Sequence, residues 1–132
     1  MTLEACYAKM GGDCGAVLLV LGNEERARRY LLRFAEDPTA RMLFAALAQA
    51  RWGDALRAAH TLRGLCRGLG LARLCASCSA LGDALRKEGL QGDAMRTEDF
   101  MMDAQLAHQV KEDYETVLRA IDELKNGEEE GL

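Results

Sequence analysis

The chain has 132 residues, a formal net charge of −4, one Pro and only 5% aromatic residues. This length suits one domain that buries its own core, and a chain rich in Ala, Leu and Arg but poor in β-branched residues favours helices over sheets. The apolar run Ala16–Leu21 is far shorter than the roughly 20 residues that span a bilayer, so we expect no membrane segment. An acidic chain with few stacking aromatics also argues against nucleic acid as a partner.

The N-terminal residues are expected to cover the domain rather than to form part of its core. Residues 2–9 predict only a loose helical turn, which a glycine-rich segment interrupts. Asp13 then caps a short additional helix that Gly22 ends. The apolar side chains that this short helix directs inward are Val17, Leu18 and Leu21.

A long helix is predicted from its cap Asn23 to about Ala50. Its apolar positions keep one helical phase on both sides of Pro38, and they are Ala27, Leu31, Phe34, Met42 and Ala45. This phase favours a single helix that is kinked at Pro38. The competing interpretation is two helices, the second capped by Asp37 with Pro38 at its first position.

The next helix opens at Asp54, after Trp52 and Gly53, and ends near residues 68–70. Projected at 100° per residue, its apolar residues form one buried face, made of Ala55, Ala58, Ala59, Leu62, Leu65, Cys66 and Leu69. His60 lies on the opposite, exposed face. Within about 80° of it lie cations and glycines, namely Arg57, Arg63, Gly64, Arg67 and Gly68.

Two more amphipathic helices complete the chain. The first runs over residues 72–88, and a loop marked by glycines follows over 89–93. Thr97 caps the last helix, which residues 126–127 close before an acidic tail at 127–132. Four long amphipathic helices with short connections predict an all-α, antiparallel four-helix bundle with a short additional N-terminal helix.

We expect a single monomeric domain over residues 1–132, with its bundle core at about 13–126. The charge along this domain is asymmetric. Residues 51–73 contain five Arg against one Asp, a local +4 that leaves −8 for the rest of the chain. A basic face on an acidic protein favours an acidic protein as the partner.

His60 is the candidate nucleophile, because imidazole is the best nucleophile that an exposed helix offers near neutral pH. Arg63 and Arg67 can lean over its ring or over an anionic group close to it, although ordinary solubilising charges remain the alternative. Gly64 and Gly68 each cost about 1 kcal/mol of helix stability relative to Ala. Glycine at these positions is explained if the surface of another molecule must come close to the helix backbone there.

Leu56 is an apolar residue one turn before His60, on the exposed side of the predicted helix. It is either a contact for a partner or a harmless surface residue. The candidate partner-binding residues are Leu56, Arg57, Gly64, Arg67 and Gly68.

The stretch Ala59–Gly70 resembles the signature of histidine-containing phosphotransfer (HPt) domains. In that signature a His, two residues, a Lys or Arg and then a Gly lie on an exposed bundle helix, and here they are His60, Arg63 and Gly64. The match extends to the Ala before the His, to Leu62 and to the Leu69–Gly70 pair. Many family members carry Asn where this chain has Gly68 and Lys where it has Arg63, differences that bear on partner contacts rather than on the nucleophile.

The resemblance implies a phosphorelay intermediate. His60 would accept a phosphoryl group from an aspartate of a receiver domain and pass it to another receiver, with Arg63 stabilising the group. The implied partners are response-regulator receiver domains and a hybrid sensor histidine kinase. The receiver would supply an acidic pocket and Mg²⁺, so we expect no cofactor bound to this chain. The resemblance also favours the single kinked helix through Pro38.

Nothing in the sequence resembles a nucleotide-binding loop or a kinase motif, so the chain would be a phosphoryl carrier rather than an ATP-dependent kinase. An alternative from another class is a helical binding module that docks on a receiver or kinase without carrying phosphate. The bundle and its basic face would look the same in both cases.

The five Cys are an odd number without the spacing of a disulfide framework, and no charged leader precedes a long apolar segment. These features favour the reducing cytoplasm. Cys75 and Cys78 form a C-x-x-C, and a zinc site that also uses Cys66 and His108 is the third hypothesis. Cys66 and Cys78 fall on apolar stripes, where Cys acts as a small hydrophobe, so we expect no metal and regard His108 as an ordinary surface residue.

Overall fold

The computed structural model describes residues 1–91 and 97–130, with side chains described over 1–87 and 104–127. Within these residues there are helices and no strands, which confirms the predicted all-α class. The helices are α1 (Leu3–Met10), α2 (Cys14–Leu21), α3 (Glu24–Glu36), α4 (Thr39–Ala48), α5 (Trp52–Gly68), α6 (Ala72–Gln91) and α7 (Thr97–Glu130).

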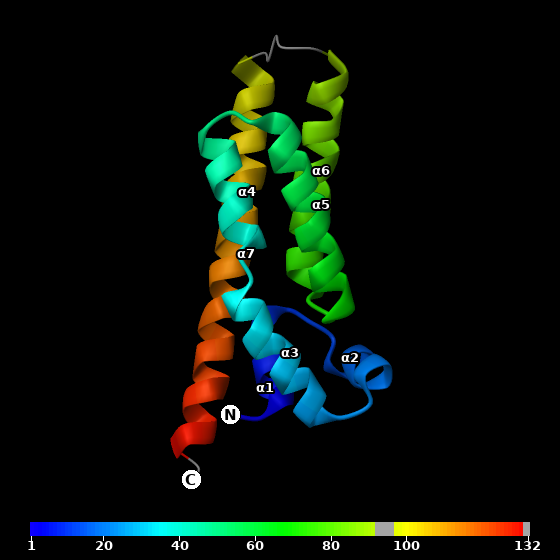
Figure 1. Cartoon of the computed structure of the whole chain (residues 1–132), viewed down its shortest axis with the longest axis vertical. Coiled ribbons are helices and arrows are strands. Elements are labelled where there is room, and N and C mark those ends of the chain that lie inside the picture. The colour runs from blue at the N-terminus through cyan, green and yellow to red at the C-terminus, as the bar shows by residue number, and fades with distance from the viewer. Residues whose placement is uncertain (92–96, 131–132) are drawn as a thin grey trace.

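Helix α7 runs along the length of the molecule, and the other helices pack beside it in two groups (Figure 1). In one half, α5 packs between α4 and α6, and α6 packs on α7. In the other half, α1 and α3 pack on α7, and α2 packs on α1 and α3. The predicted bundle is therefore present, and α3 and α4 together occupy the place of one of its long helices.

This part of the bundle is two helices, and the prediction of a single kinked helix through Pro38 is wrong. Asp37 is extended, with φ −67° and ψ 132°, and its carboxylate accepts the N–H of Thr39 at 2.9 Å. Pro38 has helical angles, φ −80° and ψ −6°. Because Pro disfavours the helical conformation in the residue before it, the chain breaks at Asp37. The apolar phase continues across the break because both helices face the same core.

Helix α1 belongs to the core, so the expectation that residues 2–9 only cover the domain is wrong. Its inward residues, no more than 1% exposed, are Leu3, Cys6, Tyr7 and Met10. The Tyr7 hydroxyl donates a hydrogen bond to the carbonyl oxygen of Leu69 at 2.7 Å, and the Asp13 N–H donates to the carbonyl of Gly70 at 2.9 Å. These two bonds tie the N-terminal segment to the end of α5, the helix that carries His60.

Helices α5, α6 and α7 extend beyond their predicted ends. Helix α5 begins at Trp52 rather than Asp54, α6 continues to Gln91 with Gly89 inside it, and α7 continues through residues 126–127 to Glu130. An interior Gly costs a helix about 1 kcal/mol, which does not end a helix that is otherwise favourable. Gly92 and Asp93 of the predicted loop lie outside the described residues.

None of the helices in the described part of the chain combines the length and the apolar character that crossing a membrane requires.

Replacing Tyr7 by Phe should lower the free energy of unfolding by about 1–3 kcal/mol, because the buried Leu69 carbonyl loses its donor. Burial raises the pKa of Tyr7, so its hydroxyl keeps the proton that it donates to the Leu69 carbonyl. Denaturant titrations of Tyr7→Phe and of the control Tyr30→Phe, at a side chain that is 43% exposed, measure the difference. The control should change stability by less than about 0.5 kcal/mol. Equal effects of the two changes would show that the Tyr7 bond contributes nothing.

Candidate functional site

His60 lies in the middle of α5 on its exposed side. The opposite side of the helix is buried almost completely, at Ala55, Ala59, Leu62 and Cys66. The predicted buried face is correct at these positions, whereas Ala58 and Leu65 are only half-buried. His60 has no hydrogen-bond or ion-pair partner among the described residues, so both of its ring nitrogens are available to another molecule.

A shallow hollow between α5 and α6 brings His60 together with two of the predicted residues. From α5 the hollow is lined by Leu56, Ala59, His60 and Arg63, and from α6 by Cys78, Ser79, Gly82, Asp83 and Arg86. Its volume is about 10 Å³, barely enough for one water molecule. The His60 region is therefore an open surface rather than an enclosed binding pocket for a small molecule.

The residues of α6 at this hollow are the part of the site that sequence reasoning missed. Gly82 has open space where a Cβ would be, with no other atom within 4 Å. Asp83 and Arg86 form an ion pair at 3.6 Å, which places a second cation near Arg63. Gly82 was a readable signal, because an interior helical Gly without a packing reason is unfavourable.

The cations predicted to surround His60 occupy separate places. Arg63 is half-buried in the hollow beside His60. Arg67 lies past it on α5, at a different hollow near the α5–α6 turn. Neither Arg63 nor Arg67 has an ion-pair or hydrogen-bond partner in the described part of the chain, so both charges are available to an incoming anion.

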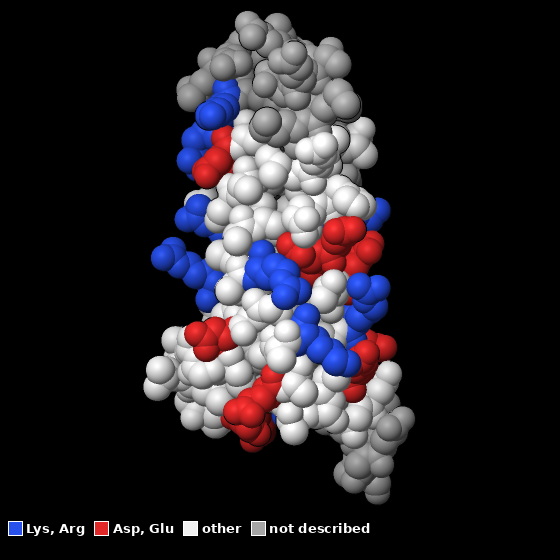
Figure 2. Space-filling view, turned by 180° about the vertical axis from the view of Figure 1, so that it is seen from behind, with Lys and Arg blue, Asp and Glu red and all other residues white. Residues whose placement is uncertain are grey.

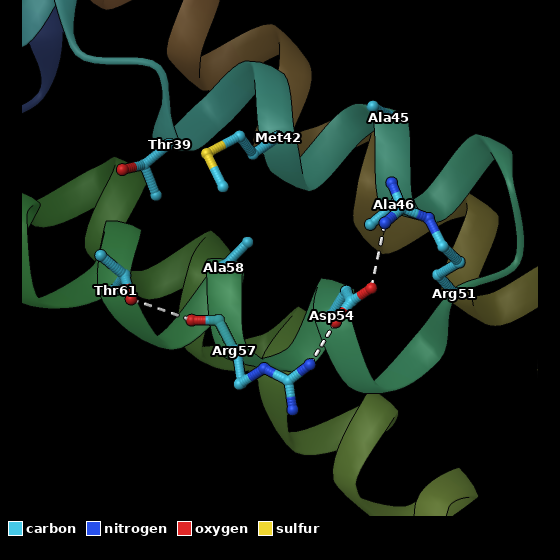
Figure 3. A pocket seen from close by; sticks show the side chains of 9 residues that line it. All are labelled: Thr39, Met42, Ala45, Ala46, Arg51, Asp54, Arg57, Ala58 and Thr61. Atoms are coloured by element: carbon cyan, nitrogen blue, oxygen red, sulfur yellow. Dashed lines mark hydrogen bonds and ion pairs between the residues drawn. The ribbon is translucent and has the colours of Figure 1, made fainter.

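Arg57 lies on another side of α5 from the His60 hollow, in a groove of about 450 Å³ between α4 and α5 (Figure 3). There Asp54 is ion-paired with both Arg57 and Arg51. The Thr61 hydroxyl donates a hydrogen bond to the carbonyl oxygen of Arg57 at 3.0 Å. Because its charge is already compensated by Asp54, Arg57 is less available than Arg63 as a phosphoryl contact.

Gly64 and Gly68 present bare backbone to solvent. A Cβ at either position would meet no other atom within 4 Å, so neither glycine is required for the packing of a neighbouring helix. Both line a hollow of about 310 Å³ between α5 and the segment α2–α3. The side chains around this hollow are Leu21, Tyr30, Arg33, Phe34, Asp37, Leu65 and Leu69.

Helix α2 adds an exposed apolar surface next to this hollow. Leu19 and Val20 are 89% and 76% exposed, and Val17 is the fully buried residue of the helix. Leu18 and Leu21, which were predicted to point inward, are half-buried. Apolar side chains exposed to this extent are typical of surfaces that meet a partner.

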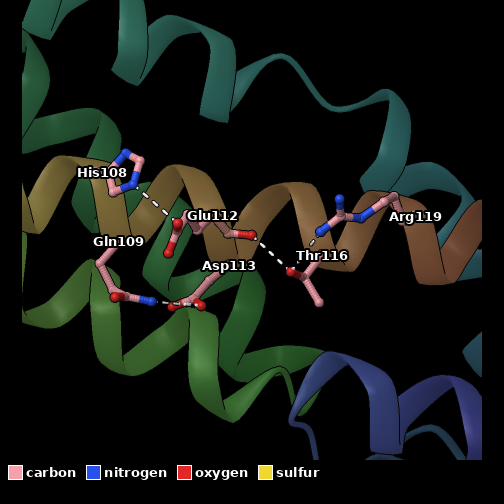
Figure 4. A network of polar contacts seen from close by, with 6 residues as sticks. All are labelled: His108, Gln109, Glu112, Asp113, Thr116 and Arg119. Carbon is pink, nitrogen blue, oxygen red and sulfur yellow. Dashed lines mark hydrogen bonds and ion pairs between the residues drawn. The ribbon is translucent and has the colours of Figure 1, made fainter.

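His108 lies on α7 within a local polar network, away from the other candidate residues (Figure 4). Its Nε2 atom is 3.1 Å from a carboxylate oxygen of Glu112, and the next residue, Gln109, donates to the buried Asp113 at 3.0 Å. His108 is exposed like His60 but differs in having a carboxylate partner on its own helix.

The five Cys are all free thiols. Cys66 and Cys78 are buried on the apolar faces of α5 and α6, as predicted, and Cys75 is half-buried. Within the described residues, no group of three or more His, Cys, Asp or Glu side chains is arranged to hold a metal ion.

The charge asymmetry of the sequence is visible on the surface. Figure 2 shows Lys and Arg side chains projecting along the left edge of the molecule, where α5 and α6 lie, while most of the Asp and Glu on that face lie elsewhere. A cationic edge beside an exposed His attracts an acidic partner.

Comparison with known proteins gives one result that covers most of the chain. A family model described as the Hpt domain matches residues 29–127. Neither the curated proteins nor the solved structures contain a match to the chain.

Proposed function

The chain belongs to the Hpt domain family, and on that premise we propose that it is a phosphorelay intermediate that carries a phosphoryl group on His60. Membership of the family makes it a phosphotransfer-related module of two-component signalling, a class whose members interact with receiver domains. The phosphoryl group would come from the aspartate of one receiver domain and pass to the aspartate of another.

The observation that supports this proposal best is the exposure of an unpaired His60 on a surface that has no pocket of its own. A ring nitrogen of neutral His60 attacks the phosphorus of an aspartyl phosphate, the P–N bond forms and the P–O bond to the aspartate breaks. The reverse reaction delivers the group to the next receiver. We assign Mg²⁺ and the acidic pocket to the receiver, while this chain supplies the nucleophile and nearby cations.

Catalysis by such a pair of proteins depends on positioning and electrostatics. The open backbone at Gly64 and Gly68 lets a receiver approach His60 closely. The hollow of about 310 Å³ beside these glycines and the exposed Leu19 and Val20 provide apolar area for docking. We therefore place the receiver over the face formed by α2, α3 and the C-terminal half of α5.

We further propose that the chain works as a monomer in the cytoplasm, with a hybrid sensor histidine kinase upstream. Five free thiols favour a reducing compartment. The phosphoryl group originates from ATP on the kinase, since no nucleotide-binding motif occurs in this sequence.

Transfer of label from a receiver tests this proposal. A receiver domain is phosphorylated with labelled acetyl phosphate, freed of excess donor and mixed with the chain and then with a second receiver. We expect label to appear on the chain and to leave it for the second receiver. Stable binding of the receiver with no label on the chain would favour the non-phosphorylated binding module and overturn the proposal.

Arg63 should contribute to transfer through its positive charge. Removing it in Arg63→Ala should slow phosphoryl acceptance by about tenfold, which corresponds to about 1.4 kcal/mol of transition-state stabilisation. Arg63→Lys should recover most of the rate, because a cation at this position is retained. Acceptance rates from a labelled receiver measure both effects, with Arg41→Ala, an exposed residue on α4, as the control. Equal rates for wild type, Arg63→Ala and Arg63→Lys would show that Arg63 is only a surface charge.

A further inference from the structure

Three of the five cysteines meet at the hairpin of α5 and α6. Cys66 lies on α5 and is fully buried, Cys75 lies in the first turn of α6 and is half-buried, and Cys78 lies one turn further along α6 and is 1% exposed. The side chain of Cys78 is close enough to the Cys66 thiol to raise its pKa.

The backbone of the hairpin connects Cys66 and Cys75 through hydrogen bonds that both involve Leu71. The Leu71 N–H donates to the carbonyl oxygen of Cys66 at 2.9 Å, and the Cys75 N–H donates to the carbonyl oxygen of Leu71 at 2.9 Å. The tight turn between the helices uses Gly70 with φ +68°. The turn therefore brings the backbone segments that carry Cys66 and Cys75 together, and both cysteines line the same hollow.

The cysteines differ in their access to solvent. Cys66 and Cys75 line the same open hollow of about 340 Å³, together with Arg67. Cys78 instead lines the shallow hollow beneath His60, which has a volume of about 10 Å³. A small oxidant that enters the larger hollow can therefore reach Cys75, and Cys66 lines the same hollow. Cys78 instead lines a hollow that barely holds a water molecule.

The two thiols of the larger hollow also differ in reactivity. The neighbouring Cys78 side chain and burial raise the pKa of the Cys66 thiol, so Cys66 is a poorer first target for an oxidant than Cys75. Cys75 is also the more exposed of the two thiols. The first oxidation is therefore expected at Cys75.

We propose that this cluster is a redox modification site, at which a peroxide oxidises Cys75 and Cys66 then forms a disulfide with it. The Cys75 thiolate attacks one oxygen of hydrogen peroxide, the O–O bond breaks, and a sulfenic acid and one water form. The Cys66 sulfur then attacks the Cys75 sulfur and displaces hydroxide, which takes the Cys66 proton and leaves as a second water. Two thiols lose two electrons in total, and the peroxide is reduced to two waters.

The bond would link α5 to α6 at the end of α5 that carries Arg67 and Gly68. Oxidation at this cluster is independent of phosphorylation at His60.

Disulfide mapping on the full chain tests the site. The reduced protein is treated with hydrogen peroxide in native buffer, its remaining thiols are alkylated, and it is digested with trypsin. Cleavage after arginines separates Cys66 in the peptide Gly64–Arg67 from Cys75 and Cys78, which share the peptide Leu74–Arg86. We expect these two peptides to be joined, and dithiothreitol to separate them.

Because one peptide holds both Cys75 and Cys78, the variants Cys75→Ala and Cys78→Ala decide which thiol takes part. The joined peptides should persist in Cys78→Ala and in the control Cys14→Ala, and they should be lost in Cys75→Ala. Circular dichroism melts show that each variant is folded, and the half-buried position of Cys75 makes Cys75→Ala less disruptive than Cys78→Ala at a buried position.

Three outcomes overturn the proposal. The first is the absence of joined peptides in the wild type at peroxide levels that oxidise its thiols to sulfinic acid. The second is their persistence in Cys75→Ala, which would place the bond between Cys66 and Cys78. The third is their formation only in urea, where the cysteines meet in the unfolded chain.

Discussion

The variant His60→Gln should fold like the wild type and accept no phosphoryl group from a receiver. The side chain is exposed and has no hydrogen-bond partner in the described structure, so its replacement by another polar residue should change stability by less than about 0.5 kcal/mol. The amide of Gln has no ring nitrogen to attack phosphorus, and the loss of transfer should be complete.

The matched control for this experiment is His108→Gln. His108 is also exposed and on a helix, but it is on α7 and pairs with Glu112. Labelled phosphate should reach His108→Gln at the wild-type rate and should not reach His60→Gln. Acid-labile label on the His60→Gln protein would overturn the assignment of His60 as the carrier.

The second large effect is expected at Gly64, four residues after His60 and beside it on the exposed face of α5. Gly64→Gln should raise the free energy of unfolding by up to about 1 kcal/mol, because an interior Gly is entropically costly in a helix. The new side chain meets no obstacle within the protein, since nothing lies within 4 Å of the added Cβ.

Phosphoryl transfer should change in the opposite direction. The Gln side chain should hold an incoming receiver away from His60, and a misplacement of about 1 Å can cost a hundredfold in rate. We therefore expect Gly64→Gln to transfer about a hundredfold more slowly and Gly64→Ala to lie between it and the wild type.

Thermal melts and acceptance rates of the same samples test both halves of this prediction. Ala104→Gln, which adds the same side chain to an exposed position on α7, should transfer normally. Unfolding of Gly64→Gln would show that Gly64 is a packing residue. A higher melting temperature with an unchanged rate would show that receivers do not approach over this face.

Sequence periodicity predicted the helix that carries His60 because α5 is a single amphipathic helix packed on one side. Its apolar spacing alone places His60 opposite Ala55 and Ala59, which are buried. Periodicity failed at Pro38 because two helices that face one core keep the same apolar phase. There the local rule, that the residue before Pro avoids the helical conformation, was the stronger indicator.

The sequence does contain the pattern that indicates helix α1. Its buried residues Leu3, Cys6, Tyr7 and Met10 follow the spacing i, i+3, i+4 and i+7 of an amphipathic helix. The glycine-rich segment that follows predicts an interruption, but Gly11 only ends the helix, with φ +66°. Gly127, by contrast, is predicted to close the last helix, yet α7 continues past it to Glu130.

The candidate site could be predicted only as far as one helix determines it. A projection of α5 places Arg57, Arg63 and Arg67 around His60, but it does not contain the neighbouring helices. Asp54 compensates Arg57 in the groove with α4, whereas Gly82 and Arg86 of α6 join His60 and Arg63. These arrangements arise from packing between helices, which no periodicity within α5 encodes.

Mapping the phosphorylated residue in the wild-type chain tests the central claim most directly. After transfer from a phosphorylated receiver, digestion with trypsin at neutral pH releases His60 in the peptide Ala58–Arg63, which also contains Thr61, and releases His108 in a different peptide. Tandem mass spectrometry before and after brief acid treatment locates the phosphoryl group and distinguishes acid-labile phosphohistidine from acid-stable phosphothreonine. The account predicts an acid-labile phosphoryl group on His60. A phosphoryl group on any other residue, or none on this chain after the receiver has lost its own in a stable complex, would contradict it.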